Sequence, residues 1–570
     1  MYKRTTVILL FLFAALSIAE DAHLALVGGT VIDVSNWGKS SNDIENAVVI
    51  LKNNKIVVVG PRDKVTIPEK AKIIDVSGTY ILPGLIDSFA VLNNQEYADA
   101  FLAYGITSIV GVDGGRRGDM FLNADPGPRI HRLEGVGTDP ISTPDLFKAI
   151  DELHAKDYQV VLLMYSLTFD QLKAAVERAH SLGMATIGEL ATTSYEEGLR
   201  AGVDAFVHTT RYSLDTAPPE MAEAIASEPF SDSLESAKWK YYFYLASLET
   251  SDPMLVKHAK TLGSGAVLIP TMSLLYLDSP ESSNPWDEPM MQRIDPAWVN
   301  NPADPKTGKH TYDPEHMAAY RKLAIAEYGL ESFYYANGAR YIAGSGTDVW
   351  GTMPGFSLHT EMEALGKIGL SNREVLAAAT SNTANTLLLE GLGEIKSGNF
   401  ADVIVLNENP LEDLKALRNI RHLFLKGKEI DLKTLGQKKE YENGDIIEKK
   451  PLDFSDELKA QVAETKYYET QFTGDFDYAN DVEMSEIFYS SDGLKVHGYL
   501  AEPKEPGTYP CIIYNRGGNK EFGSLNERKM LFILARIASW GYVVVGSNYR
   551  GNGGGEGLEQ FGGAEVNDIL

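Results

Sequence analysis

Two sets of polar side chains directly follow apolar runs typical of β-strands. Asp348 follows the run at 341–347, and a carboxylate at the carboxyl end of a buried strand can act as a general acid or base. The loop after the run at 106–112 carries Arg116 and Arg117, whose guanidinium groups could bind a substrate carboxylate through paired hydrogen bonds. Structural roles are the alternatives, because Asp348 could cap the next turn and the arginines could be solvated or ion-paired.

The elements that must position these side chains alternate between short apolar strands and amphipathic helices. Capping boxes begin at Thr168 and Ser371. Eight successive β-then-α units predict an α/β fold, a closed (β/α)8 TIM barrel over 81–389. An open doubly wound sheet is the alternative, although no GxGxxG motif follows the first strand. The predicted strands are 81–87, 106–112, 129–134, 158–164, 184–189, 203–208, 266–271 and 341–347.

Insertions and flanking segments complete the predicted organisation. The first insertion (209–255) and the second insertion (272–314) follow carboxyl ends of strands, so each is expected to be a lid, a substrate-lining loop or surface decoration. Residues 431–482 are rich in polar residues and predict a linker with one helix. Residues 483–570 then predict a new α/β segment.

The N-terminal flank, before the barrel, has β character. Two β-branched runs at 47–60 surround Asn53 and Asn54, and asparagine tolerates the positive φ of a two-residue hairpin turn. The segment at 393–430 after the barrel also alternates like β-strands. β-structure is therefore expected on both sides of the barrel.

Charge and cysteine content exclude several classes of function. The chain has 52 Lys and Arg residues against 79 Asp and Glu residues, a formal net charge of −27. Such a chain repels phosphate backbones and anionic membrane surfaces, so neither nucleic-acid nor membrane partners are expected. Cys511 is the sole cysteine, which rules out an internal disulfide and a cysteine-rich metal site. Any metal must rest on His, Asp, Glu or Lys.

The amino terminus is typical of an export signal. Lys3 and Arg4 precede a short apolar run, and small residues end near Ala19. We therefore expect a signal peptide at 1–19 and export, to a bacterial periplasm. A buried first strand or a short anchor is the alternative.

Several motifs together resemble the amidohydrolase superfamily. They are Leu82-Pro83-Gly84-Leu85-Ile86-Asp87, Ala201-Gly202-Val203-Asp204 before His208, Gly344-Ser345-Gly346-Thr347-Asp348, Leu358-His359-Thr360-Glu361 and Gly398-Asn399-Phe400-Ala401-Asp402. The resemblance implies a barrel whose flanks, 20–80 and 390–430, pair into a composite β-sandwich. It also implies hydrolysis assisted by one or two divalent cations, with an Asp after the last strand moving a proton.

The ligand set implied by this family is incomplete here. Ser88 and Ala90 stand where we place the two histidines of the family's HxH motif, and neither side chain replaces an imidazole. His208 and Asp348 match the family pattern, and Glu189 is the candidate third metal ligand. Bound zinc, manganese or iron is one expectation; a barrel that lost its metal centre, or metal-free chemistry at Asp348, are the others.

The last part of the chain resembles the beginning of a prolyl oligopeptidase-like α/β-hydrolase domain. The likeness rests on Asp492-Gly493-Leu494-Lys495, Asn515-Arg516-Gly517-Gly518 and Asn548-Tyr549-Arg550-Gly551. No G-x-S-x-G nucleophile motif occurs in the sequence, so serine peptidase activity of this chain is not expected. The segment 483–570 is expected to be incomplete and poorly stable by itself, or part of a longer fusion.

Two functional hypotheses follow. The first is an exported amidohydrolase-like enzyme that cleaves C–N bonds of a small amide or peptide-like substrate. The second is a non-catalytic barrel that serves as a binding or scaffold domain for a peptidase-like partner domain. The retained His208 and Asp348 favour the first hypothesis, whereas the residues at Ser88 and Ala90 favour the second.

Overall fold

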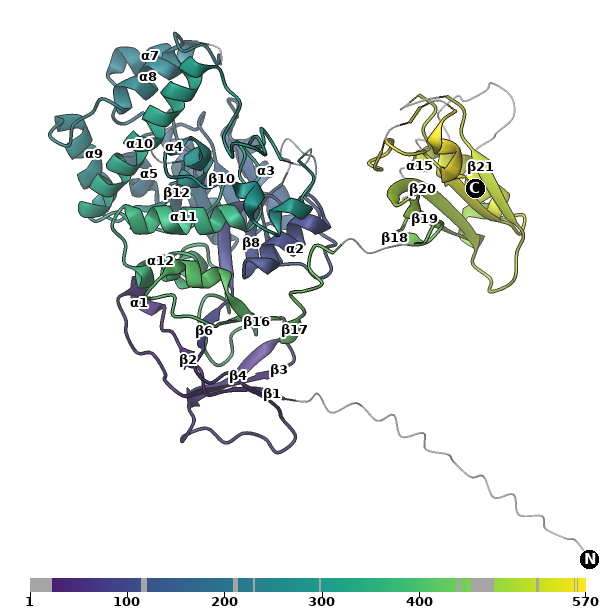
Figure 1. Ribbon diagram of the computed structural model, residues 1–570. Helices are drawn as coiled ribbons and strands as arrows, with labels where there is room; N and C mark the ends of the chain where they lie inside the picture. Colours follow the sequence, from purple (N-terminus) through teal and green to yellow (C-terminus); the bar gives the residue numbers. More distant parts are fainter. Residues whose placement is uncertain are drawn as a thin grey trace, which may run out of the picture. The chain divides into compact units, whose positions relative to one another are not determined.

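The fold comes from a computed structural model, which describes residues 23–113, 120–208, 214–228, 231–296, 299–437, 442–452, 476–518, 522–557, 559–560 and 562–569. The predicted signal peptide, Arg116, Arg117 and the predicted linker helix lie outside these residues. Contacts divide the chain into two units, Met1–Gln437 and Lys438–Leu570 (Figure 1). Within the described ranges, no helix combines the length and the apolar character that crossing a bilayer requires.

Eight parallel strands of the first unit form one curled sheet in which neighbours in space follow chain order. The backbone N–H of Ser88 donates to Ala343 O (3.0 Å), and that of Gly346 donates to Phe89 O (2.8 Å). These bonds join the first strand to the segment after the last, as a TIM-like barrel requires, and not an open doubly wound sheet. The strands are β7 (Leu85–Ala90), β8 (Ile106–Val112), β9 (Arg129–Val136), β10 (Val160–Leu163), β11 (Ala185–Gly188), β12 (Ala205–Val207), β13 (Val267–Ile269) and β14 (Arg340–Tyr341).

The predicted first strand, 81–87, is divided between two sheets. Its first half belongs to β6 (Tyr80–Pro83), which pairs with β15 (Val403–Leu406), a strand that follows the barrel in the sequence. Only its second half enters the barrel, as part of β7. Gly84 lies between the two, where a Cβ atom would stand 1.9 Å from Thr107 Oγ1. A glycine is therefore needed where the chain crosses from one sheet to the next.

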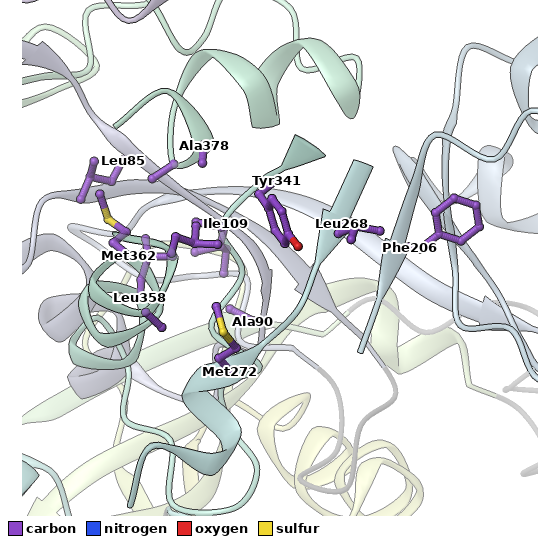
Figure 2. Close-up of a cluster of buried hydrophobic side chains, with 14 of the residues drawn as sticks. Leu85, Ala90, Ile109, Phe206, Leu268, Met272, Tyr341, Leu358, Met362 and Ala378 are labelled. Atoms are coloured by element: carbon purple, nitrogen blue, oxygen red, sulfur yellow. The ribbon is translucent and has the colours of Figure 1, made fainter. Parts of the chain in front are cut away.

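Helices cover the outside of the curled sheet (Figure 1). The predicted capping boxes at Thr168 and Ser371 are confirmed, and α4 (Phe169–Ser181) buries Leu172 and Val176 on one face. Figure 2 shows Leu358 and Met362 of α11 in the buried cluster between helices and strands. The helices are α2 (Gln95–Ala103), α3 (Thr143–Ala155), α4 (Phe169–Ser181), α5 (Tyr195–Ala201), α7 (Pro219–Ser227), α8 (Ala237–Leu245), α9 (Pro253–Gly263), α10 (Pro314–Ala336), α11 (Phe356–Lys367), α12 (Asn372–Ala378) and α13 (Ser381–Thr386).

Two smaller sheets are built from the flanks of the barrel. One has the order β4-β3-β1-β5, and the other, β17-β16-β15-β6-β2, combines strands from both flanks. The predicted hairpin at 47–60 is confirmed, with Asn53 at φ 53° in its turn. A shared apolar cluster that includes Leu26, Ile81 and Phe424 packs the sheets together. The strands are β1 (Leu24–Val27), β2 (Thr30–Val31), β3 (Ala47–Lys52), β4 (Lys55–Pro61), β5 (Lys72–Asp75), β15 (Val403–Leu406), β16 (Ile420–Leu425) and β17 (Lys428–Ile430).

The second unit is a five-stranded sheet of order β18-β19-β20-β22-β21. The segment at 483–570 contains strands and helix, as predicted, and a helical run at 527–538 packs Leu534 and Ala535 against one face of the sheet. β18 (Ile446–Pro451) corrects one expectation, because part of the predicted linker is a strand paired with β19. The other strands are β19 (Val482–Ser491), β20 (Leu494–Pro503), β21 (Cys511–Asn515) and β22 (Val543–Ser547).

Substituting Gly84 tests the crossing between the two sheets. Gly84→Ala should lower the free energy of unfolding by about 1–3 kcal/mol, because its methyl group overlaps Thr107. The matched control is Gly329→Ala in α10, where a Cβ meets nothing within 4 Å, and this change should be neutral or stabilise by up to about 1 kcal/mol. Urea unfolding of both variants measures the difference; equal stability would contradict the predicted clash.

Candidate functional site

His208 stands at the carboxyl end of the barrel, directly after β12. Its side chain is buried, and its Nδ1 lies 2.7 Å from Oγ1 of Thr271, which follows the neighbouring strand β13. The Thr271 hydroxyl also lies 2.6 Å from Pro270 O, and its single hydrogen can be donated either to this carbonyl or to His208 Nδ1. In the tautomer in which the hydroxyl donates to the carbonyl, Nδ1 donates to Thr271 and Nε2 is the hydrogen-bond acceptor of the imidazole.

The backbone at these two positions is held in an unusual conformation. His208 has φ 56° and Thr271 has φ 53°, both in the left-handed region. A β-branched residue there is an outlier whose cost must be offset by surrounding contacts. Such strain is typical of functional sites, and here two adjacent strand ends share it.

Asp348 lies after β14 and is 5% exposed. Its carboxylate accepts hydrogen bonds from Asn93 Nδ2 (2.8 Å), the Tyr97 hydroxyl (2.9 Å) and the Asn300 backbone N–H (3.4 Å). Asn93 and Tyr97 follow the first barrel strand, so they orient the carboxylate from across the closure of the sheet. Asp348 is therefore a firmly oriented carboxylate at the barrel end where such enzymes place their chemistry.

The second insertion contacts the loop that carries Asp348. Besides the Asn300 N–H bond to Asp348, the Asn300 carbonyl accepts from the backbone N–H of Gly351 (2.8 Å). The buried His310 ring donates from Nε2 to Trp350 O (2.9 Å). These contacts place part of the second insertion against the candidate site, which is the position that a lid or a substrate-lining loop requires.

The side chain of β7 that meets His208 is that of Phe89. The two rings pack edge to face with centroids 5.4 Å apart, whereas Ser88 Oγ is buried without a hydrogen-bond partner in the described part of the chain. An apolar ring therefore lies beside His208. Phe89, Thr271, Tyr97 and Asn300 were missed by sequence reasoning, because only their proximity in the folded chain marks them.

Asp87 is a second carboxylate at this end of the barrel, and it is fully buried. Its Oδ1 accepts from the backbone N–H groups of Ser345 (2.8 Å) and Phe89 (3.3 Å). Oδ2 has no hydrogen-bond partner within the described residues. Burial raises the pKa of Asp87 to about 6, and the two N–H donors offset only part of that rise.

The predicted metal ligands lie at the ends of three different strands. Glu189 directly follows β11 and is buried. His208 directly follows the next strand, β12, and Asp348 comes after β14. Among the residues that the structure describes, no three His, Cys, Asp or Glu side chains form a group able to hold a metal ion. These donors do not fit the two-metal centre that the family resemblance implies. Ligation by the three residues stays a prediction.

A groove of about 780 Å³ lies elsewhere, where α5 and α9 lead into their strands. It is at the amino ends of β12 and β13, the face of a barrel where residues serve stability more often than chemistry. We therefore assign the candidate site to the opposite end. The groove is lined by Glu196, Leu199, Arg200, Gly202, Val203, Lys257, Lys260, Thr261, Ser264 and Gly265.

Comparisons with known sequences give short matches. No protein-family model matches the chain. The Uncharacterized peptidase YtmA of Bacillus subtilis (strain 168) is 45% identical over 89 residues, which are 16% of this chain and 33% of that protein. Adenine deaminase 1 of Desulfotalea psychrophila is 36% identical over 98 residues, 16% of each chain. The chain thus spans a third or less of the curated relatives it matches.

Comparisons with solved structures concern the fold. A bottromycin amidohydrolase superposes with a TM-score of 0.52 at 16% identity, covering 72% of this chain and 88% of that one. A Xaa-Pro dipeptidase has a TM-score of 0.48 at 16% identity, with 72% and 100% coverage. At this level of identity, the likeness to the bottromycin amidohydrolase shows a shared barrel fold.

Asp87→Asn tests the buried carboxylate. Because the pKa of Asp87 is raised from 3.8 to about 6, the folded state binds the extra proton and loses stability as pH rises through this window. The Asn variant does not titrate, so its stability relative to the native chain should increase by about 1.4 kcal/mol per pH unit between about pH 4 and 6. Urea unfolding at several pH values measures this slope; a difference independent of pH would contradict it.

Metal content tests the incomplete ligand set. We expect the full chain, purified without chelator or affinity histidines, to hold clearly less than one equivalent of zinc, manganese or iron. A zinc site needs at least three protein ligands, and no three donors of the described residues lie close enough together to form one. Elemental analysis after dialysis against each cation provides the measurement. A full equivalent that disappears in His208→Gln would show that His208 belongs to a metal site and would contradict this expectation.

Proposed function

We propose that this protein is a barrel hydrolase that cleaves a C–N bond of a small amide or peptide-like substrate. The observation that supports this proposal best is the placement of His208 and Asp348 at the carboxyl end of the barrel, each oriented by buried partners. The names of the structural neighbours, an amidohydrolase and a dipeptidase among them, agree with this reaction class.

The reaction that fits these residues is hydrolysis by water. Water oxygen bonds to the acyl carbon, the C–N bond breaks, and a proton from water reaches the leaving nitrogen through Asp348. His208 Nε2, as an acceptor, would orient the attacking water or the amide N–H. Tyr97 and Asn93 hold the Asp348 carboxylate in one direction during the transfer.

Three finer points belong to the same proposal. Export to a periplasm follows from the apolar run near the amino terminus. A degenerate metal site follows from Ser88 and Ala90 at the expected histidine positions, and the apolar ring of Phe89 beside His208 agrees with it. A prolyl oligopeptidase-like character of 483–570 follows from the quoted motifs, and the sequence match to a peptidase agrees with it.

Turnover of a defined library tests the function. The full chain is incubated with N-acyl amino acids and Xaa-Xaa dipeptides, and products are followed by mass spectrometry. Asp348→Asn should lower kcat/KM for any substrate found by about 100-fold or more, as expected for loss of a general acid–base group. His208→Gln should also impair turnover, whereas His180→Gln, at a half-exposed histidine of α4 paired with Asp204, should not.

Two outcomes would contradict this assignment. Undiminished hydrolysis by Asp348→Asn would remove the proposed mechanism. Tight binding of library members without any turnover would instead favour the barrel as a binding or scaffold domain.

A further inference from the structure

Three consecutive residues after β13 connect the two candidate functional side chains. In this bridging segment, residues 271–273, Thr271 Oγ1 contacts His208 Nδ1 at 2.7 Å. Two residues later, the Ser273 hydroxyl donates to the Ser345 backbone carbonyl at 2.6 Å. Ser345 begins the short loop that ends at Asp348. His208 and the Asp348 loop are thus attached to opposite ends of one short piece of chain.

Glu361 of α11 also holds the bridging segment through a backbone hydrogen bond. The backbone N–H of Ser273 donates to Glu361 Oε2 at 2.7 Å, and Glu361 is fully buried. The side chain of Met272, between the two polar residues, is buried in the same apolar cluster as Ala90 of β7 (Figure 2). Each residue of the segment therefore has a distinct anchor.

The loop that ends at Asp348 is held through both backbone polar groups of Ser345, its N–H and its carbonyl. Asp87 accepts from the Ser345 N–H at 2.8 Å, while Ser273 donates to its carbonyl. The Ser345 hydroxyl lies 2.7 Å from the Thr347 hydroxyl and accepts from the Thr347 N–H at 3.1 Å. These bonds leave the backbone just before Asp348 little freedom to move.

We infer that Glu361 and Ser273 are positioning residues that couple the orientation of His208 to that of Asp348 through the bridging segment. The inference rests on the proposed function in giving this coupling a catalytic purpose. Neither residue needs to touch substrate. They hold the side chains of His208 and Asp348 at one fixed separation, and a small displacement of the bridging segment would change this separation.

The charge state of Glu361 agrees with a purely structural acceptor. Burial raises its pKa to about 8, and the nearby buried Glu327 and Glu331 of α10 add to the rise. The carboxyl group is therefore neutral at pH 7 and accepts from Ser273 as an amide oxygen would. An amide in its place should hold the segment equally well, whereas an apolar side chain of the same size should not.

Four variants of the full chain separate these possibilities. Ser273→Ala removes only the hydroxyl that holds Ser345, Glu361→Gln keeps an acceptor, and Glu361→Leu removes it. Ser264→Ala, at the end of α9, removes an exposed serine hydroxyl as the matched control. Hydrogen exchange of the amides at 344–347 and the side-chain ¹⁵N spectrum of His208, assigned by its loss in His208→Gln, are measured for each folded variant.

Ser273→Ala and Glu361→Leu should accelerate exchange at 344–347 by about tenfold or more and shift the His208 resonances. Glu361→Gln and Ser264→Ala should remain within about twofold of the native chain. If Ser273→Ala leaves exchange unchanged, or Glu361→Gln disturbs it as much as Glu361→Leu, the inference is wrong. These readouts do not depend on turnover, so failure of the proposed function is distinguishable from failure of the positioning role.

Once a substrate has been found, steady-state kinetics of the same variants give a second test. Ser273→Ala should lower kcat with little change in KM, and Glu361→Gln should restore the activity that Glu361→Leu loses. A rise in KM alone would mean that the segment binds substrate directly, which would overturn the positioning role.

Discussion

The closure of the curled parallel sheet is the constraint on which the rest of the first unit depends. An unpaired strand edge is open to pairing with another chain, and closing the sheet removes this free edge from β7. The Ser88–Ala343 and Gly346–Phe89 backbone hydrogen bonds make the closure. The same closure brings Asn93 and Tyr97, which follow β7, onto Asp348, which follows β14. The contacts that orient the Asp348 carboxylate therefore depend on closure of the barrel.

Buried carboxyl groups are placed along this closure at a cost in stability. Asp87 and Glu361 are both fully buried, with the pKa of each raised by desolvation. A protein that needed only an apolar core would not keep two such groups around one short loop. Their retained hydrogen bonds converge on Ser345 and Ser273, which indicates that the position of the Asp348 loop matters more than the stability lost there.

The surroundings of His208 differ from those expected of a metal ligand in the family that the sequence motifs resemble. Phe89 packs against the imidazole where a further ligand would be needed, and Thr271 occupies Nδ1. The likeness to a solved amidohydrolase is one of fold at low identity, and a fold does not by itself specify the chemistry. The proposed reaction is therefore hydrolysis in which the protein's own side chains orient water and move the proton.

Local pattern in the sequence determined the elements: eight apolar runs, the hairpin at Asn53 and the capping boxes at Thr168 and Ser371 were predictable, because period, turn and cap chemistry act over a few residues. Asp348 was marked by its place after an apolar run and His208 by the family motifs, whereas the roles of both residues stay predictions. Tertiary structure alone decided that β6 leaves the barrel at Gly84 and that Phe89 faces His208. It also decided that Ser273 and Glu361 connect the two strand ends, because contacts across strand order depend on closure of the sheet, which no local pattern encodes.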